Sequence, residues 1–314
     1  MHKARKFEQQ PAWSISDVGT IAGLAALLLP SWLLPERLWG PLWRARVRLK
    51  LLTNRTAVRH AAKHIRATLG VDARKAERIS EGLRAAVHEM QMQDLRAWRP
   101  GGWHPRMIVD GEDHLRRALA QGKGAVLWVA PFIFNSGPTK IALHEKGYRV
   151  SHLSSPKHGY SETRFGVAYL NKVRCIPEDR YIAQRIIFDR YAPATAMRRM
   201  MRALKAGEVV SIVAASTEGS DMIKAPIFGG RLPVAVGAPR LAGLTGAPLL
   251  PLFTVREADG AFRIAIEPPI EMDAGLSTEA RCIAAAVAFL RRSEPWVRRF
   301  PEQWRAWSKW RRSE

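Results

Sequence analysis

Hydrophobic positions along this chain follow two periods in turn, one typical of amphipathic helices and one typical of buried strands. In residues 75–96, apolar side chains recur at the three- and four-residue spacing of a helix. The same reading predicts further helices at 139–147, 194–207, 241–247 and 277–292, and strands at 125–129, 149–153, 208–214, 248–253 and 262–266. Because strands and helices alternate, the pattern predicts an α/β fold whose mostly parallel central sheet is flanked by helices, with residues 51–314 forming one domain.

The amino terminus has a different pattern. An uncharged apolar segment runs from Val18 to Pro35, near the lower end of the roughly 17–25 residues that span a bilayer. Basic residues flank it on both sides, so both ends favour the same anionic surface. We therefore expect residues 1–50 to contain a hydrophobic helix and to associate with a membrane, with an interfacial or re-entrant anchor favoured over a full span. A helix buried against the domain is the alternative.

Charge narrows the choice of partners. The 314 residues include 50 Lys and Arg against 28 Asp and Glu, a formal net charge of +22, and the hydrophobic share of 47% excludes disorder as the main state. Such a surplus attracts phosphates, acidic proteins and anionic lipids. The cations are scattered and no zinc-finger or RNP-type signature is present, so nucleic acid is not expected. The two cysteines, Cys175 and Cys282, exclude a disulfide framework and a zinc cluster.

Five segments, in order, carry a family resemblance. They are VDGEDHLRRALAQGKGAVLW (109–128), RFG (164–166), ALKAGEVVSIV (203–213), APIFGGRLPVAVGAPRLAGLTGAPLLPLF (225–253) and PEQWRAWSKWRR (301–312). Together they resemble the bacterial lipid A late acyltransferases, within the lysophospholipid acyltransferase fold. The resemblance implies transfer of a fatty acyl chain from acyl carrier protein or acyl-CoA to a lipid or glycolipid acceptor. It places the protein at the cytoplasmic face of the bacterial inner membrane and implies no cofactor or metal.

The catalytic dyad of that family is missing here. Family members carry a His, followed five positions later by Asp or Glu, after the strand expected at 125–129. The matching positions in this chain are Pro131 and Ser136. Neither side chain can take a proton from an acceptor hydroxyl at neutral pH. Three hypotheses therefore remain open.

In the first hypothesis, another histidine acts as the base. His158 and Glu162 lie one helical turn apart if their segment is helical, and the resemblance makes the nearby Arg164 a substrate contact. The alternative is that His158 is a surface-loop residue. In the second hypothesis no histidine is needed, and Asn135 and Ser136 donate hydrogen bonds to the developing oxyanion. The alternative there is a plain turn in which Asn135 caps the next helix. In the third hypothesis, the chain is a lipid-binding scaffold without catalysis.

Two further segments are candidates for substrate binding. Glu218, Gly219 and Ser220 resemble the Glu-Gly-Thr block of glycerolipid acyltransferases, which implies contact with an acceptor phosphate. Lys224 and Arg231 flank a Pro-Ile-Phe-Gly-Gly segment and suit either phosphate or the acidic surface of acyl carrier protein. The alternative for both segments is ordinary solvated surface.

Near the carboxyl terminus, aromatic residues recur at helical spacing. Trp296, Phe300, Trp304 and Trp307 form one stripe if the segment is a continuous helix. Such a helix either lies on an anionic bilayer or packs its stripe on the sheet.

Overall fold

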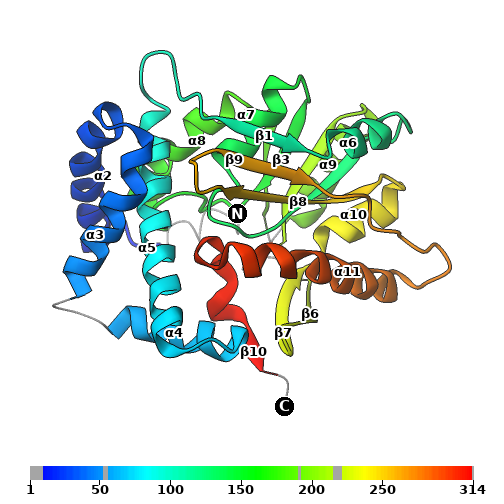
Figure 1. Cartoon of the computed structure of the whole chain (residues 1–314). Helices are drawn as coiled ribbons and strands as arrows, with labels where there is room; N and C mark the ends of the chain where they lie inside the picture. Colours follow the sequence, from blue (N-terminus) through cyan, green and yellow to red (C-terminus); the bar gives the residue numbers. More distant parts are fainter. Residues whose placement is uncertain (1–9, 52–55, 190–191, 215–220, 313–314) are drawn as a thin grey trace.

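A seven-stranded, mostly parallel sheet runs through the centre of the protein (Figure 1). The computed structural model describes residues 10–51, 56–189, 192–214 and 221–312. The strand order is β1-β9-β8-β2-β5-β3-β4, and the only antiparallel neighbours in this sheet are β8 and β9. The strands are β1 (Met107–Asp110), β2 (Ala125–Val129), β3 (Val150–Ser154), β4 (Gln184–Ile187), β5 (Val209–Val213), β8 (Leu249–Arg256) and β9 (Phe262–Ile266). The predicted α/β class with a mostly parallel sheet is confirmed.

Helices cover both faces of this sheet. The helices packed along it are α6 (Glu112–Leu119), α7 (Gly137–Glu145), α8 (Lys172–Asp179), α9 (Pro193–Lys205), α10 (Gly237–Thr245) and α11 (Thr278–Arg299). The central strand β2 shows the division: Val126 and Trp128 belong to the core formed with α9, α10 and α11, whereas Leu127 and Val129 belong to the core formed with α6 and α7. Alternate side chains of a strand point to opposite faces, so one apolar run supplies both cores.

A layer of helices packs beside the sheet around the long helix α5 (Ala73–Arg96) (Figure 1). Its members are α2 (Ile15–Leu33), the short η1 (Glu36–Leu38), α3 (Trp39–Leu51) and α4 (Thr56–Leu69). Asp72 caps α5 by accepting a hydrogen bond from the Lys75 amide at 2.7 Å. Trp39 and Trp43 pack on Met92 of α5. Residues 1–50 were expected as a separate segment, and their described part contacts the rest of the chain mainly through α5.

Helix α2 is the hydrophobic N-terminal helix that the sequence predicts. It is long and apolar enough to cross a membrane by length and composition. Only a narrow stripe faces the protein, formed by Asp17, Leu24, Leu27 and Ser31. The opposite side leaves large apolar side chains exposed, namely Ile15, Val18, Ile21, Leu28, Leu29 and Leu33. The alternative of a helix buried against the domain is therefore wrong.

Asp17 is the one charged residue of α2, and it faces inward. Its two carboxylate oxygens accept hydrogen bonds from the hydroxyls of Ser161, at 2.5 Å, and Thr163, at 2.8 Å. The backbone amides of Arg164 and Phe165 donate to the carbonyls of residues 11 and 12. The segment after β3 is thus fastened to the start of α2.

The aromatic residues near the carboxyl terminus do not form one helical stripe. Helix α11 ends at Arg299, and two short helical turns follow, η3 (Pro301–Gln303) and η4 (Arg305–Lys309). Trp304 and Trp307 are buried and contact Phe228. Phe228 lies between strands β6 (Met222–Ile227) and β7 (Gly230–Ala235), which form a small sheet with β10 (Arg311–Arg312). Of the two alternatives for these tryptophans, packing on the protein is confirmed.

The same carboxyl-terminal segment holds the loop after β2. The backbone N–H of Arg305 donates to the Pro131 carbonyl at 3.0 Å, and the N–H of Ile133 donates to the Gln303 carbonyl at 2.8 Å. Phe132 and Trp304 form an antiparallel bridge between these contacts. The loop that carries Pro131 is therefore fixed from outside the sheet.

Candidate functional site

A cavity of about 680 Å³ opens at the carboxyl ends of β2, β3 and β5. In parallel sheets this edge is where ligands usually bind. Its polar end contains Pro131, Asn135, Ser136, His152 and His158. Its apolar wall comes mainly from α9 and the end of β5, with Phe188, Met197, Met200, Ile212 and Val213. The volume lies within the range of about 300–1,000 Å³ that is usual for small-molecule sites.

The Glu178 carboxylate lies behind the polar end of this cavity, bonded to two side chains that line it, Ser136 and His158. One oxygen, Oε2, accepts from Lys140 Nζ at 2.6 Å, from Arg185 Nη2 at 2.9 Å and from His158 Nε2 at 3.0 Å. The other oxygen, Oε1, accepts from the Ser136 hydroxyl at 2.5 Å. Glu178 and Lys140 are each about 4% exposed, so these contacts lie away from water. One carboxylate thereby joins four polar side chains from four segments.

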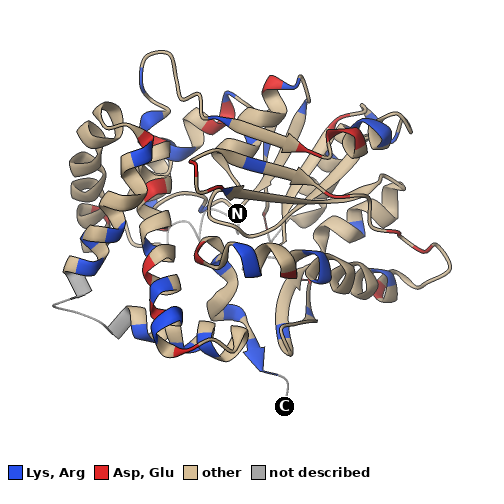
Figure 2. Cartoon of the chain, viewed as in Figure 1, with Lys and Arg blue, Asp and Glu red and all other residues tan. Residues whose placement is uncertain are grey.

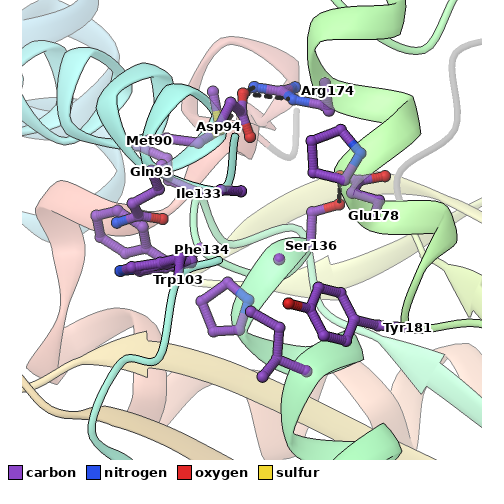
Figure 3. A pocket seen from close by; sticks show the side chains of 15 residues that line it. Met90, Gln93, Asp94, Trp103, Ile133, Phe134, Ser136, Arg174, Glu178 and Tyr181 are labelled. Carbon is purple, nitrogen blue, oxygen red and sulfur yellow. Dashed lines mark hydrogen bonds and ion pairs between the residues drawn. The ribbon is translucent and has the colours of Figure 1, made fainter. Parts of the chain in front are cut away.

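Helix α8 is held in place by a second ion pair. Arg174, one turn before Glu178, donates twice to Asp94 Oδ2 on α5, at 2.8 and 2.7 Å. The Tyr160 hydroxyl donates to the same carboxylate. Figure 3 shows both the Arg174–Asp94 pair and the Ser136–Glu178 bond around a smaller neighbouring pocket. Because Arg174 fixes α8 against α5, the position of Glu178 is fixed as well.

His158 lies in a turn after β3, and α8 also positions this turn. Asn171, at the start of α8, accepts from the backbone amides of Tyr160 and Ser161 at 2.7 and 2.9 Å. Gly159 has a φ of +148°, and a Cβ there would lie 2.5 Å from the Asn171 side chain. Only glycine suits both the conformation and the close approach. The residue directly after His158 thus lets the turn close onto α8.

Electrostatics favour an ionised Glu178 beside a neutral His158. Burial raises the pKa of Glu178, but the nearby Lys140, His158 and Arg185 outweigh this and hold that pKa well below its usual range. Burial lowers the pKa of His158, and the Glu178 carboxylate only partly offsets the effect. Because an ionised carboxylate only accepts hydrogen bonds, His158 Nε2 carries the proton of the neutral ring. Nδ1 is then the unprotonated, basic nitrogen.

The structure changes the partner expected for His158. Residues 155–163 form turns and bends, so His158 and Glu162 do not share a helix face. Glu162 is exposed and pairs with Lys157 Nζ at 2.6 Å. The carboxylate partner of His158 is Glu178, twenty positions later. The expected pairing of His158 with Glu162 is therefore wrong.

Pro131 and Ser136, the positions that the resemblance matches to the family dyad, line the same cavity as His158. Pro131 lies at its polar end. Ser136 donates its only hydroxyl hydrogen to Glu178, so in this arrangement it does not donate to a substrate oxyanion. The Asn135 amide donates to the Ala130 carbonyl at 3.0 Å. It closes the turn after β2. One alternative had predicted that Asn135 caps α7, and this is wrong.

The other expected binding residues lie elsewhere. Arg164 is exposed on the side of α2 and does not line the cavity. Lys224 on β6 and Arg231 on β7 point to solvent on the outer face of their hairpin, away from the buried side chains between them. Because these cations are on a different surface, the structure does not bring them to the site. Glu218, Gly219 and Ser220 lie outside the described residues.

Sequence reasoning missed Glu178, Lys140 and Arg185 as members of the site. They come from α8, α7 and β4, and no local spacing links them. Within the described ranges, no group of three or more His, Cys, Asp or Glu side chains is placed to hold a metal ion.

Substitution of Glu178 tests the buried charge cluster. Glu178→Ala leaves Lys140 and Arg185 without their shared carboxylate, and we expect it to lower the free energy of unfolding by about 3–5 kcal/mol. Urea denaturation at neutral pH measures this change. Glu162→Ala is the matched control, since the exposed Glu162 side chain contributes only about 0.5 kcal/mol or less to the free energy of unfolding. A Glu178→Ala protein as stable as the control would contradict the cluster.

Comparison with known families places the chain in one of them. The family model of bacterial lipid A biosynthesis acyltransferases matches residues 151–311, just over half of the chain. No curated protein matches the chain. The matched range includes His158, Glu178 and Arg305 and begins after Pro131 and Ser136. The chain belongs to the bacterial lipid A biosynthesis acyltransferase family.

Proposed function

We propose that the protein is a membrane-associated enzyme that transfers a fatty acyl chain from acyl carrier protein or acyl-CoA to a lipid or glycolipid acceptor. Family membership supports acyl transfer to a lipid-type acceptor. The observation that carries the proposal is the His158–Glu178 pair, whose histidine lines the same cavity as Pro131 and Ser136, the positions that the resemblance matches to the family dyad. The histidine and the acid come from other segments, but their chemistry is that of the dyad.

In the proposed reaction, His158 is the general base. Nδ1 takes the proton of the acceptor hydroxyl or amine as its oxygen or nitrogen attacks the thioester carbonyl. The new acyl bond forms, the C–S bond breaks, and the imidazolium returns the proton to the leaving sulfur. Glu178 holds Nε2–H and stabilises the imidazolium while it exists. Lys140 and Ser136 position Glu178 through their hydrogen bonds to its carboxylate.

The remaining cavity residues suit the acyl chain and the oxyanion. Asn135 uses one amide hydrogen on Ala130, and its second hydrogen is the proposed donor to the developing negative charge. The apolar wall along α9, with Met197 and Met200, accommodates hydrocarbon. In this arrangement the reacting groups lie at the polar end of the cavity, and the hydrocarbon tail of the acyl chain lies at the apolar end.

A second candidate function is lipid binding without catalysis. The observation that favours it is Pro131, which stands where the resemblance places the catalytic histidine. In that case the cavity binds an acyl lipid, and the Glu178 cluster is only structural. The two functions differ in a single measurable property, turnover.

The proposed location is the cytoplasmic face of the bacterial inner membrane, with α2 as the anchor. The exposed face of α2 is apolar, and Figure 2 shows Lys and Arg on α3 and α5 beside a helix without them. An apolar face next to cations is typical of helices that lie on an anionic bilayer. The inward-facing Asp17 supports an interfacial position over a full span.

Transfer of label from a radiolabelled acyl-acyl carrier protein to a lipid extract tests the catalytic role. We expect His158→Ala to lower the rate by about a hundredfold to ten-thousandfold, because it removes the base. His144→Ala is the matched control, since His144 is exposed at the end of α7. Equal rates for both variants would exclude His158 and leave acyl transfer standing. No labelled lipid from the wild type under any condition would favour the non-catalytic candidate.

The pH dependence follows from the lowered pKa of His158. A base acts in its unprotonated form, so kcat/KM should decline only as the pH falls below the ordinary histidine value of 6.5. Glu178→Gln removes a charge that favours the imidazolium, and we expect the acidic limb to move to still lower pH. A limb above pH 6.5 in the wild type, or no movement in Glu178→Gln, would argue against this assignment.

Sedimentation with vesicles tests the anchor. The double substitution Leu29→Glu and Leu33→Glu places charges on the exposed face of α2, and binding should weaken at least about tenfold. The vesicles contain phosphatidylethanolamine and phosphatidylglycerol, with phosphatidylcholine alone as the comparison. Leu244→Glu, on the exposed side of α10, is the control and should sediment like the wild type. Equal sedimentation of all three proteins would remove α2 as the anchor.

A further inference from the structure

Two cations line the large cavity without a carboxylate partner among the residues that the structure describes. Arg305 and Lys309 are the first and last residues of η4, and both contribute to the wall. Arg305 donates to the sulfur of Met90 at 2.7 Å. Neither side chain forms an ion pair with any described residue. The nearby Asp94 is already bonded by Arg174 and Tyr160.

The surroundings of these cations disfavour their charge. Burial lowers the pKa of Arg305 to about 10, and the positive charge of Arg174 adds to the effect. Burial also lowers the pKa of Lys309. A partly desolvated cation without a counter-charge is costly, so a pair of them facing one cavity is complementary to an anion.

The rest of the wall leaves this positive charge uncompensated. Asp221 lines the cavity, but Arg240 Nη1 pairs with it at 2.6 Å. Helix α10 begins at Gly237 in the same wall, and no atom lies within 4 Å of where a Cβ would be on that residue. The start of a helix carries partial positive charge. It adds to the field of Arg305 and Lys309 over open space.

We propose that Arg305 and Lys309 bind a phosphate group of the substrate. This inference rests on the proposed function and extends it, because it states which chemical group the cavity recognises. A phosphate ester satisfies both cations, while the apolar wall along α9 takes the attached hydrocarbon. The phosphate belongs either to the pantetheine arm of the donor or to the headgroup of the acceptor.

Arg305 is suited to this task by its position. Its backbone N–H holds the Pro131 carbonyl at 3.0 Å, so the guanidinium is fixed to the loop at the polar end of the cavity. A phosphate bound there lies in the same cavity as His158. The side chain can be changed without removing the backbone contact, which makes substitution informative.

Equilibrium binding by tryptophan fluorescence tests the proposal without turnover. The donor arm compares S-tetradecyl coenzyme A, a thioether that cannot transfer its chain, with S-tetradecyl pantetheine, which lacks phosphate. The acceptor arm compares lysophosphatidic acid with monoacylglycerol. In one arm, the phosphate-bearing compound should bind about tenfold or more tightly than its neutral counterpart. That arm identifies the source of the phosphate.

The variants decide whether these residues are responsible. In Arg305→Gln/Lys309→Gln, the preference for phosphate should fall to about threefold or less. Arg305→Lys keeps the charge and should retain most of the preference, and Arg291→Gln, at an exposed position of α11, should behave like the wild type. Unchanged phosphate binding in the double variant, or neutral compounds that bind as tightly as their phosphate counterparts in both arms, would overturn the proposal. Loss of transfer in His158→Ala bears only on the proposed function.

Discussion

A single buried carboxylate sets the geometry on which this site depends. Glu178 is out of contact with water, so its charge must be balanced within the protein, and the balance comes from Lys140, Arg185, His158 and Ser136. These side chains come from α7, β4, the turn after β3 and the loop after β2. The cost of leaving any of these charges unpaired keeps four segments in register at the carboxyl edge of the sheet. Arg174 then ties this arrangement to α5.

The sequence predicted the buried parts of the fold well and the edges poorly. The central strand at 125–129 has the predicted bounds, because a strand buried on both faces is a continuous apolar run. The strand at 262–266 also has the predicted bounds, although Arg263 interrupts its apolar residues. Edge strands β1 and β4 are short and of mixed polarity, and the apolar pattern did not reveal them. The helix predicted at 277–292 is present as α11, but two of its large apolar residues, Ile283 and Val287, are exposed. Small residues face the core there instead, because they let the helix pack closely.

The sequence predicted one member of the candidate proton-transfer pair and missed the other. His158 was identified, since it is a histidine near segments that resemble the family. Its acid was not, because the contact between His158 and Glu178 depends on how α8 packs against α5, and this packing leaves no local pattern in the sequence. The nearer Glu162 had suitable spacing only in a helix that does not form. In the proposed function, the proton-transfer pair is assembled by tertiary packing and not by the local spacing that the resemblance places at Pro131 and Ser136.

The inward orientation of Asp17 has a mechanical consequence. Its hydrogen bonds reach Ser161 and Thr163, a few residues from the imidazole that points into the cavity. A pull on α2 from the lipid side would act on that turn before it acted on the sheet, because the two are bonded directly. In the proposed arrangement, the hydrogen bonds of Asp17 therefore couple the membrane-facing helix directly to the turn that carries His158.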